Sequence, residues 1–256
     1  NFKIFKKNFK PSIYFLENQK KIILKNLGKI GIKKKKFVCV IVRDDKYLKE
    51  KLPGINFNYH NYRDSNIKTF NLAINYLIKK GYFILRMGKS QKKKLKINKK
   101  NFFDYSFSNV RSDLMDVWLM ANCDFCISTG TGLDQISRIY NKPILFLNFL
   151  PLIDWSSHFR SLTHPKFLFD KKLKKFMSYQ EHMNHSYFRQ DEYIKNNIKI
   201  VDLNSSEILS CTKEFLLLIK NQWKMSSKSK IQQNNFRKSF LKYLSCIKKK
   251  ESIDYH

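Results

Sequence analysis

A short glycine-rich segment carries the residue types and spacing that most clearly suggest chemistry in this sequence. Ser128, Thr129, Gly130, Thr131 and Gly132 follow directly on an apolar run. The backbone N–H groups of such a loop, with the positive end of a following helix, favour an anion. The segment therefore predicts a loop that binds a phosphate group.

The same segment also has a purely structural interpretation. Thr131 and Asp134 have the three-residue spacing of a capping box, in which an acidic side chain returns to the backbone at a helix start. Short glycine motifs often occur without a ligand. Donor binding and helix capping therefore both stay open for Asp134, and capping is the favoured role.

Three arginines extend the predicted anion site. Arginine accounts for only 8 of the 51 basic residues, yet Arg43 and Arg86 stand at the ends of apolar runs and Arg63 lies in a polar segment. A guanidinium group makes two parallel hydrogen bonds to phosphate oxygens. The three side chains predict a diphosphate clamp. The alternative is that Arg43 and Arg63 form ordinary surface ion pairs with the aspartates that follow them.

The expected elements bring these groups to one edge of a sheet. Helical spacing separates four apolar runs that predict buried strands, at 37–42, 82–85, 125–127 and 142–148. The alternation predicts a parallel α/β sheet with right-handed crossovers. Such sheets bind ligands outside the carboxyl ends of their strands.

The flanking segments are less informative. Residues 1–36 are lysine-rich and indicate helix and linker, and the chain begins with Asn1, which is consistent with a fragment or a processed product. Ser112 is the expected N-cap of one helix, and Ser205 or Ser206 that of another after a last strand at 198–203. Residues 231–248 predict an amphipathic basic helix, which we expect to pack on the protein and not on a membrane.

The composition restricts the function classes. The formal charge of +31 attracts polyanions, nucleotides and anionic membrane surfaces without choosing among them. No apolar stretch approaches the roughly 18–20 residues of a membrane span. The five cysteines are odd in number and lie mostly in apolar runs, which indicates reduced, buried thiols and a cytoplasmic protein. Cys123 and Cys126 are expected on opposite faces of a strand, so no metal or redox pair is predicted there.

A set of longer motifs carries a family resemblance. They stand in order at 60–65, 81–88, 104–105, 111–116, 125–134, 143 and 148–152, and include Tyr-Arg-Asp-Ser, Gly-Tyr-Phe-Ile-Leu-Arg-Met-Gly and Cys-Ile-Ser-Thr-Gly-Thr-Gly. With these motifs the chain resembles a bacterial family of sequence-defined glycosyltransferases from surface-polysaccharide loci. The resemblance covers about residues 37–155.

The resemblance implies a GT-B-like architecture with two Rossmann-like domains, in which the C-terminal one holds the nucleotide-sugar donor without a metal or another cofactor. On that basis, residues 1–36 are a linker or a remnant of a truncated or reduced N-terminal domain. Residues 37–223 form the donor-binding domain and 224–256 the basic C-terminal helix. The diphosphate-binding residues are then Arg43, Arg63, Arg86 and the loop Ser128, Thr129, Gly130, Thr131 and Gly132.

The expected reaction moves a sugar from a nucleoside diphosphate sugar to a cell-surface glycan or a lipid-linked acceptor. An inverting transfer needs a general base, for which His60 and Asp44 are the candidates unless an N-terminal domain supplies it. The expected location is cytoplasmic, with peripheral contact at the inner face of the plasma membrane as a further option. The alternatives are a non-catalytic basic module that binds RNA or an anionic membrane, and a degenerate transferase that binds a nucleotide without chemistry.

Overall fold

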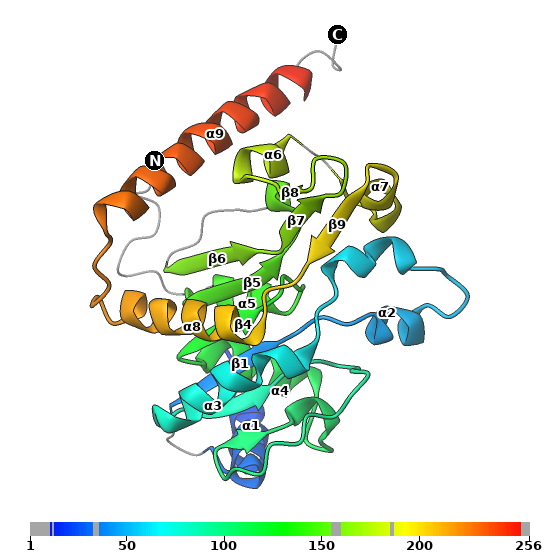
Figure 1. Ribbon diagram of the computed structural model, residues 1–256. Coiled ribbons are helices and arrows are strands. Elements are labelled where there is room, and N and C mark those ends of the chain that lie inside the picture. The colour runs from blue at the N-terminus through cyan, green and yellow to red at the C-terminus, as the bar shows by residue number, and fades with distance from the viewer. Residues whose placement is uncertain (1–10, 12, 33–35, 155–159, 185–186, 252–256) are drawn as a thin grey trace.

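A six-stranded parallel sheet forms the centre of the computed structural model, which describes residues 11, 13–32, 36–154, 160–184 and 187–251 (Figure 1). The strand order is β3-β2-β1-β4-β5-β6. The bounds are β1 Phe37–Ile41, β2 Phe83–Arg86, β3 Phe102–Phe103, β4 Phe125–Ser128, β5 Ile144–Phe149 and β6 Ser161–Pro165. The chain starts at the centre and runs outward on each side, which is the Rossmann order. The prediction of a Rossmann-like α/β sheet is confirmed.

Helices cover both faces of the sheet, which is why its central strands are apolar at every position. α3 (Asn71–Lys79) and α8 (Ser205–Ile219) pack on one face, against Val38 and Val40 of β1. The neighbouring residues Cys39 and Ile41 face α1 (Glu17–Ile30) and α4 (Asp113–Asn122) on the other side, with α5 (Asp134–Ile139) beside them. Successive side chains of β1 therefore contribute alternately to two separate hydrophobic cores.

The N-terminal helix belongs to one of these cores. Ile23, Leu27 and Ile30 of α1 are buried against the sheet. Residues 17–30 therefore form a helix that covers one face of the sheet. They lie within residues 1–36, for which the sequence indicates a helix and a linker. Before α1, the structure describes only Pro11 and residues 13–16.

A second, antiparallel sheet was not anticipated from the sequence. It has the order β8-β7-β9, with bounds β7 Phe167–Asp170, β8 Lys175–Phe176 and β9 Ile198–Val201. Only β9 matches an expected strand. β6 and β8 lack a continuous apolar run, and the apolar run of β7 is only three residues long; the three strands were missed because they are short and largely half-buried or exposed.

Short helices fill the connections. The stretch 46–61, which reads as a loop in the sequence, contains α2 (Lys46–Lys51) and most of the 3₁₀ helix η1 (Asn58–Arg63). The others have these bounds: η2 Ile67–Phe70, η3 Tyr105–Phe107, η4 Leu152–Asp154, α6 Tyr179–Met183 and α7 Gln190–Lys195. η1 packs against α7, next to β9.

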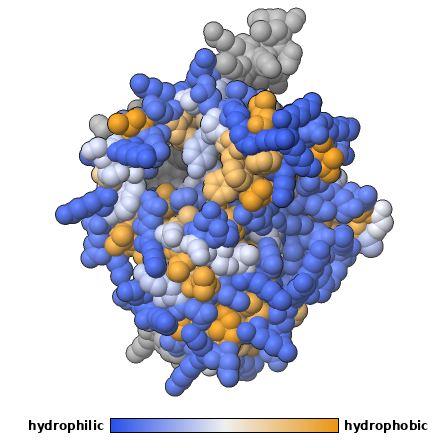
Figure 2. All heavy atoms as spheres, viewed as in Figure 1, coloured by the Kyte–Doolittle hydropathy of each residue, from blue (hydrophilic) through white to orange (hydrophobic). Residues whose placement is uncertain are grey.

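The last helix, α9 (Ser227–Glu251), runs along one end of the molecule (Figure 1). It packs against α6, where the rings of Tyr179 and Phe236 meet edge to face at 5.8 Å. This agrees with the expectation that the helix packs on its own protein. Among the described residues, no helix combines the length and the apolar character needed to cross a membrane. Hydrophilic residues predominate on the face seen in Figure 2, with hydrophobic ones scattered among them.

Removal of the Phe215 ring tests the contact between α8 and the sheet. Phe215 is fully buried, and its ring packs edge to face on Phe125 of β4 at 5.4 Å. Phe215→Ala is expected to lower the free energy of unfolding by about 3–5 kcal/mol, since it leaves a cavity. Leu217→Ala on the same helix, where Leu217 is 44% exposed, should cost less than about 1 kcal/mol. Urea denaturation measures both, and equal losses would contradict this packing.

Candidate functional site

The ends of β1 and β4 meet at the centre of the sheet, where ligand crevices form in this fold. The backbone N–H of Arg43, just after β1, donates to Thr129 Oγ1, just after β4, at 2.9 Å. The Arg43 carbonyl in turn accepts from the Ser65 N–H at 3.0 Å. The two strand ends and the Tyr-Arg-Asp-Ser segment are thereby held together, as the sequence placement of these motifs predicts.

The glycine loop is satisfied largely by its own side chains. Ser128 Oγ donates to Asp134 Oδ2 at 2.6 Å, and the Thr131 N–H donates to the same oxygen at 2.7 Å. The Gly130 N–H donates to Ser128 Oγ at 3.1 Å. Burial raises the pKa of Asp134, and these hydrogen bonds oppose the rise. The expectation that the N–H groups of Gly130 and Thr131 point at a ligand is wrong, because internal acceptors take both.

Asp134 closes the glycine loop by accepting from the Thr131 N–H, but the predicted role as a helix cap is wrong, because the N-cap of α5 is Leu133 and no side chain caps it. The Asp134 side chain is fully buried, and its second oxygen accepts from Gln135 Nε2 at 2.8 Å. No described hydrogen bond runs in the reverse direction, since Thr131 Oγ1 is buried without a partner. The carboxylate serves as the anion of the loop.

Gly130 is required by the shape of the loop. Its φ is +82°, a backbone conformation that residues other than glycine rarely adopt. A Cβ at this position would lie 3.1 Å from two ring carbons of Phe149. The Gly130 carbonyl accepts from Arg63 Nη2 at 2.9 Å. The loop thus packs on β5 from one side and anchors an arginine on the other.

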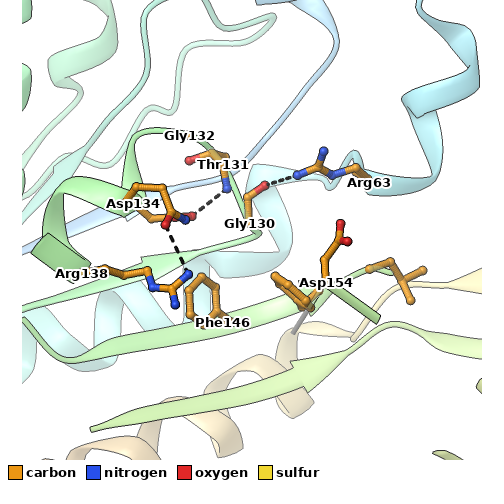
Figure 3. A pocket seen from close by; sticks show the side chains of 11 residues that line it. Arg63, Gly130, Thr131, Gly132, Asp134, Arg138, Phe146 and Asp154 are labelled. Atoms are coloured by element: carbon orange, nitrogen blue, oxygen red, sulfur yellow. Dashed lines mark hydrogen bonds between the residues drawn. The ribbon is translucent and has the colours of Figure 1, made fainter. Parts of the chain in front are cut away.

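A cavity of about 270 Å³ opens beside this loop (Figure 3). Arg63 reaches Gly130 on one side of it, Asp154 lies nearby, and Arg138 approaches from the other side. The lining includes Arg63, Gly130, Arg138, Phe146, Phe149 and Asp154. Two guanidinium groups, the carboxylates of Asp134 and Asp154 and two aromatic rings therefore border one hollow at the carboxyl edge of the sheet.

The two arginines of the predicted ion pairs have other partners than the sequence suggests. Arg43 pairs with Asp64 through Nη1 and also donates to the His60 carbonyl at 3.1 Å. Arg63 does not pair with Asp64; it binds the loop carbonyl, and its buried Nε has no partner among the described residues. The ion pairs expected with the aspartates next in sequence are wrong. The Arg63 guanidinium therefore keeps N–H donors without a described partner, whereas the Arg43 guanidinium is already bonded to Asp64 and to the His60 carbonyl.

Arg86 is not brought to the cavity. It is 1% exposed, and its guanidinium donates to Gln91 Oε1 at 3.0 Å and to Asp104 Oδ2 at 3.2 Å, and also to the Lys93 carbonyl. These contacts fix the long connection from β2 to β3. The structure separates Arg86 from the residues with which the sequence grouped it, because it is held by its own connection.

The two candidate bases do not line the cavity either. Asp44 accepts backbone N–H bonds from Lys46 at 3.1 Å and Lys92 at 2.9 Å, so both of its oxygens hold chain segments together. Burial lowers the pKa of His60, and nearby arginines lower it further. Its imidazole is therefore neutral at neutral pH, and its ring lies 4.1 Å from the Tyr59 ring at a tilt of 41°.

The sequence reasoning missed Arg138 and Asp154. Arg138 follows Asp134 by four residues on α5, a spacing that puts both on one side of a helix. Asp154 ends η4, shortly after β5, so the rule of strand ends that selected Arg43 could have found it. Burial raises the pKa of Asp154, and Arg63 opposes this rise.

Thiols and metal ligands contribute nothing to this cavity. Cys39, Cys123, Cys126 and Cys211 are buried and free, as the sequence predicts, and the Cys246 side chain lies outside the described residues. Within the described ranges, no three His, Cys, Asp or Glu side chains lie close enough together to hold a metal ion.

Comparison of the chain with protein-family models, with curated proteins and with solved structures gives no match. The fold and the arrangement of the cavity therefore carry the functional argument.

Truncation of Asp134 tests the internal compensation of the loop. Asp134→Ala leaves the Ser128 hydroxyl and the Thr131 N–H buried without an acceptor, so the free energy of unfolding should fall by about 2–4 kcal/mol. Asp134→Asn keeps an acceptor oxygen and is expected to cost clearly less. Urea denaturation compares the two variants. Equal losses would show that the charge, and not the hydrogen bonding, stabilises the loop.

The Arg43–Asp64 pair predicts a pH dependence of stability. Burial raises the pKa of Asp64 to about 6 although Arg43 opposes the rise. The folded chain then binds this proton more tightly than the unfolded chain, so the Asp64 contribution to stability falls as the pH rises from about 4 to about 6. Asp64→Asn should remove this slope. The measurement is the urea midpoint of both proteins across that range, and parallel profiles would refute the assignment.

Proposed function

We propose that this chain is a glycosyltransferase and that the cavity beside the glycine loop binds the diphosphate of a nucleoside diphosphate sugar. The observation that carries the proposal is the hydrogen bond from Arg63 Nη2 to the Gly130 carbonyl. It fixes a guanidinium at the cavity wall, and apart from the buried Nε–H the remaining N–H groups have no partner among the described residues and are available to an anion. The position at the carboxyl edge of a Rossmann-ordered sheet is where nucleotides bind in such folds.

The chemistry follows from what the cavity offers. When the bond between sugar and diphosphate breaks, negative charge develops on the departing diphosphate. Arg63 and Arg138, already held in place on either side, would neutralise this charge without reorganisation. Phe146 and Phe149 supply apolar surface for a sugar face or a base. This assigns to the two arginines the role that the sequence gave to Arg43, Arg63, Arg86 and the loop N–H groups.

Asp154 is the base that fits this site best. An inverting transfer needs a group that takes the proton of the acceptor hydroxyl. Asp154 lines the cavity and is exposed to it, and partial desolvation raises its pKa, which makes its carboxylate a stronger base than one with the ordinary pKa. His60 and Asp44, the candidates from the sequence, lie outside the cavity lining. We therefore place Asp154 ahead of them.

The proposal extends to the architecture and the acceptor. In this proposal the six-stranded sheet corresponds to the donor-binding half of a GT-B-type enzyme. The acceptor would be a cell-surface glycan or a lipid-linked sugar reached from the cytoplasmic side of the membrane. The support for these points is the motif resemblance together with the Rossmann strand order.

A basic binding module is the second candidate. Seven lysines are exposed within residues 89–100, a stretch without a carboxylate. The buried contacts of Arg86 and Asp104 hold this stretch in place. Such a surface would bind RNA or an anionic membrane, with an affinity that falls steeply as salt rises.

Nucleotide binding by an Arg63 variant separates the candidates. At 100 times its dissociation constant, a ligand adds about 2.7 kcal/mol to the free energy of unfolding, or several degrees in Tm. We expect one nucleoside diphosphate to stabilise the full chain at physiological salt. Arg63→Ala should weaken that binding at least about tenfold, since it removes a charge-assisted contact.

Arg237→Ala, on the exposed surface of α9, is the matched control and should bind like the unaltered chain. Thermal unfolding against a panel of nucleoside diphosphates and single-stranded RNA reads out both variants. If all polyanions stabilise the chain equally, or if both variants lose binding alike, the donor site is refuted and the basic module is supported.

A further inference from the structure

A second cavity, of about 380 Å³, lies across η1 from the first. Arg63 of η1 lines the first cavity, whereas its neighbours Asn61 and Tyr62 line the second, together with Asp64. One short 3₁₀ segment is therefore a wall of both hollows. The far wall of the second cavity comes from β9 and α7, which lie beside η1 in Figure 1.

A buried lysine supplies a fixed positive charge to this second cavity. Lys166, between β6 and β7, is 2% exposed. Its ammonium donates to the Asp64 carbonyl at 2.5 Å and pairs with Asp202 Oδ1 at 2.9 Å. An ammonium group has three N–H donors, and the third has no partner in the described part of the chain. Burial of a charge is costly, so an unused donor here favours an anionic ligand.

The rim of the second cavity is basic and part of its wall is apolar. Lys171 and Lys199 are exposed at the rim, and neither pairs with a described carboxylate. Ile194, 65% exposed, and Ile200 provide the apolar surface. The cavity thus combines three ammonium groups and the carboxylates of Asp64 and Asp202 with an aliphatic wall. Lysines outnumber carboxylates, and the two rim lysines are unpaired among the described residues, which suits a ligand that has an anionic head and an apolar body.

We propose that this cavity binds the phosphoryl group of a phosphate ester that carries an aliphatic chain. The free N–H of Lys166 and the ammonium groups of Lys171 and Lys199 contact the phosphate oxygens, and the chain lies along Ile194 and Ile200. The identification of this ligand as the acceptor rests on the proposed function. Its binding does not, because the residues that hold it are separate from the donor cavity.

Octyl phosphate, inorganic phosphate and octanol serve as probes in calorimetric titrations of the full chain at physiological salt. Octyl phosphate should bind more tightly than either of the other two, since only it engages both the lysines and the isoleucines. Equal binding of octyl phosphate and inorganic phosphate would exclude a role for the apolar wall. Equal binding of octyl phosphate and octanol would exclude recognition of the phosphoryl group, and each result would overturn the proposal.

The decisive variant removes the two rim charges. Lys171→Gln with Lys199→Gln should weaken octyl phosphate binding at least about tenfold, a change of about 1.4 kcal/mol. The matched control is Lys172→Gln with Lys174→Gln, which loses the same charge from exposed positions outside the cavity lining. The control should bind octyl phosphate within about twofold of the unaltered chain. Equal weakening in both pairs would show non-specific attraction. These four lysines are exposed, so all variants are expected to fold.

Titrations with the nucleoside diphosphate on the same proteins keep the two proposals apart. The rim variant should retain nucleotide binding, and Arg63→Ala should retain octyl phosphate binding. Loss of nucleotide binding alone in Arg63→Ala would support separate sites. If the unaltered chain binds octyl phosphate but no nucleotide, only the donor assignment fails. If it binds the nucleotide but not octyl phosphate, only the present inference fails.

Discussion

The ion pair between Arg43 and Asp64 connects the parts of the molecule on which both cavities depend. Arg43 extends from the end of β1, Asp64 follows η1, and the Asp64 carbonyl accepts from the buried Lys166 between the two sheets. Charges taken out of water are stable only with partners in place. Each of these three groups therefore restrains the other two, and η1 is held between the parallel and the antiparallel sheet. Since η1 carries Arg63 toward one cavity and Asn61 toward the other, its position determines the shape of both.

Two backbone N–H groups of the glycine loop are bonded by side chains of the loop and of the helix that follows it. The Asp134 carboxylate takes the Thr131 N–H, and Ser128 takes the Gly130 N–H. The N–H groups of these two loop residues are thus not available to a ligand, and the donors that border the cavity from the side are guanidinium groups. Gly130 remains necessary for a different reason, because its positive φ and its contact with Phe149 close the loop against β5.

The sequence predicts the elements that are dictated by local chemistry. Apolar runs located the central strands, and Ser112 is the N-cap of α4, where its Oγ accepts from the Met115 N–H at 3.2 Å. The expected N-cap of α8, Ser205 or Ser206, was wrong by one or two positions, since Asn204 caps this helix. Partners distant in sequence were not predictable in this way. Asp64 pairs with a residue 21 positions away, and β8, which has only one apolar residue, is held by its pairing with β7.

The arginines show why a residue type can select candidates for a site without assigning their roles. The planar guanidinium fits carboxylates and backbone carbonyls as well as it fits phosphate. Arg86 uses this geometry on Gln91, Asp104 and the Lys93 carbonyl, and is buried among them. Among the described residues, Arg63 makes one hydrogen bond with its guanidinium, to the Gly130 carbonyl, beside an open cavity. The two side chains end in the same chemical group. They differ in accessibility and in the number of donors already bonded, which depends on packing between segments far apart in the chain.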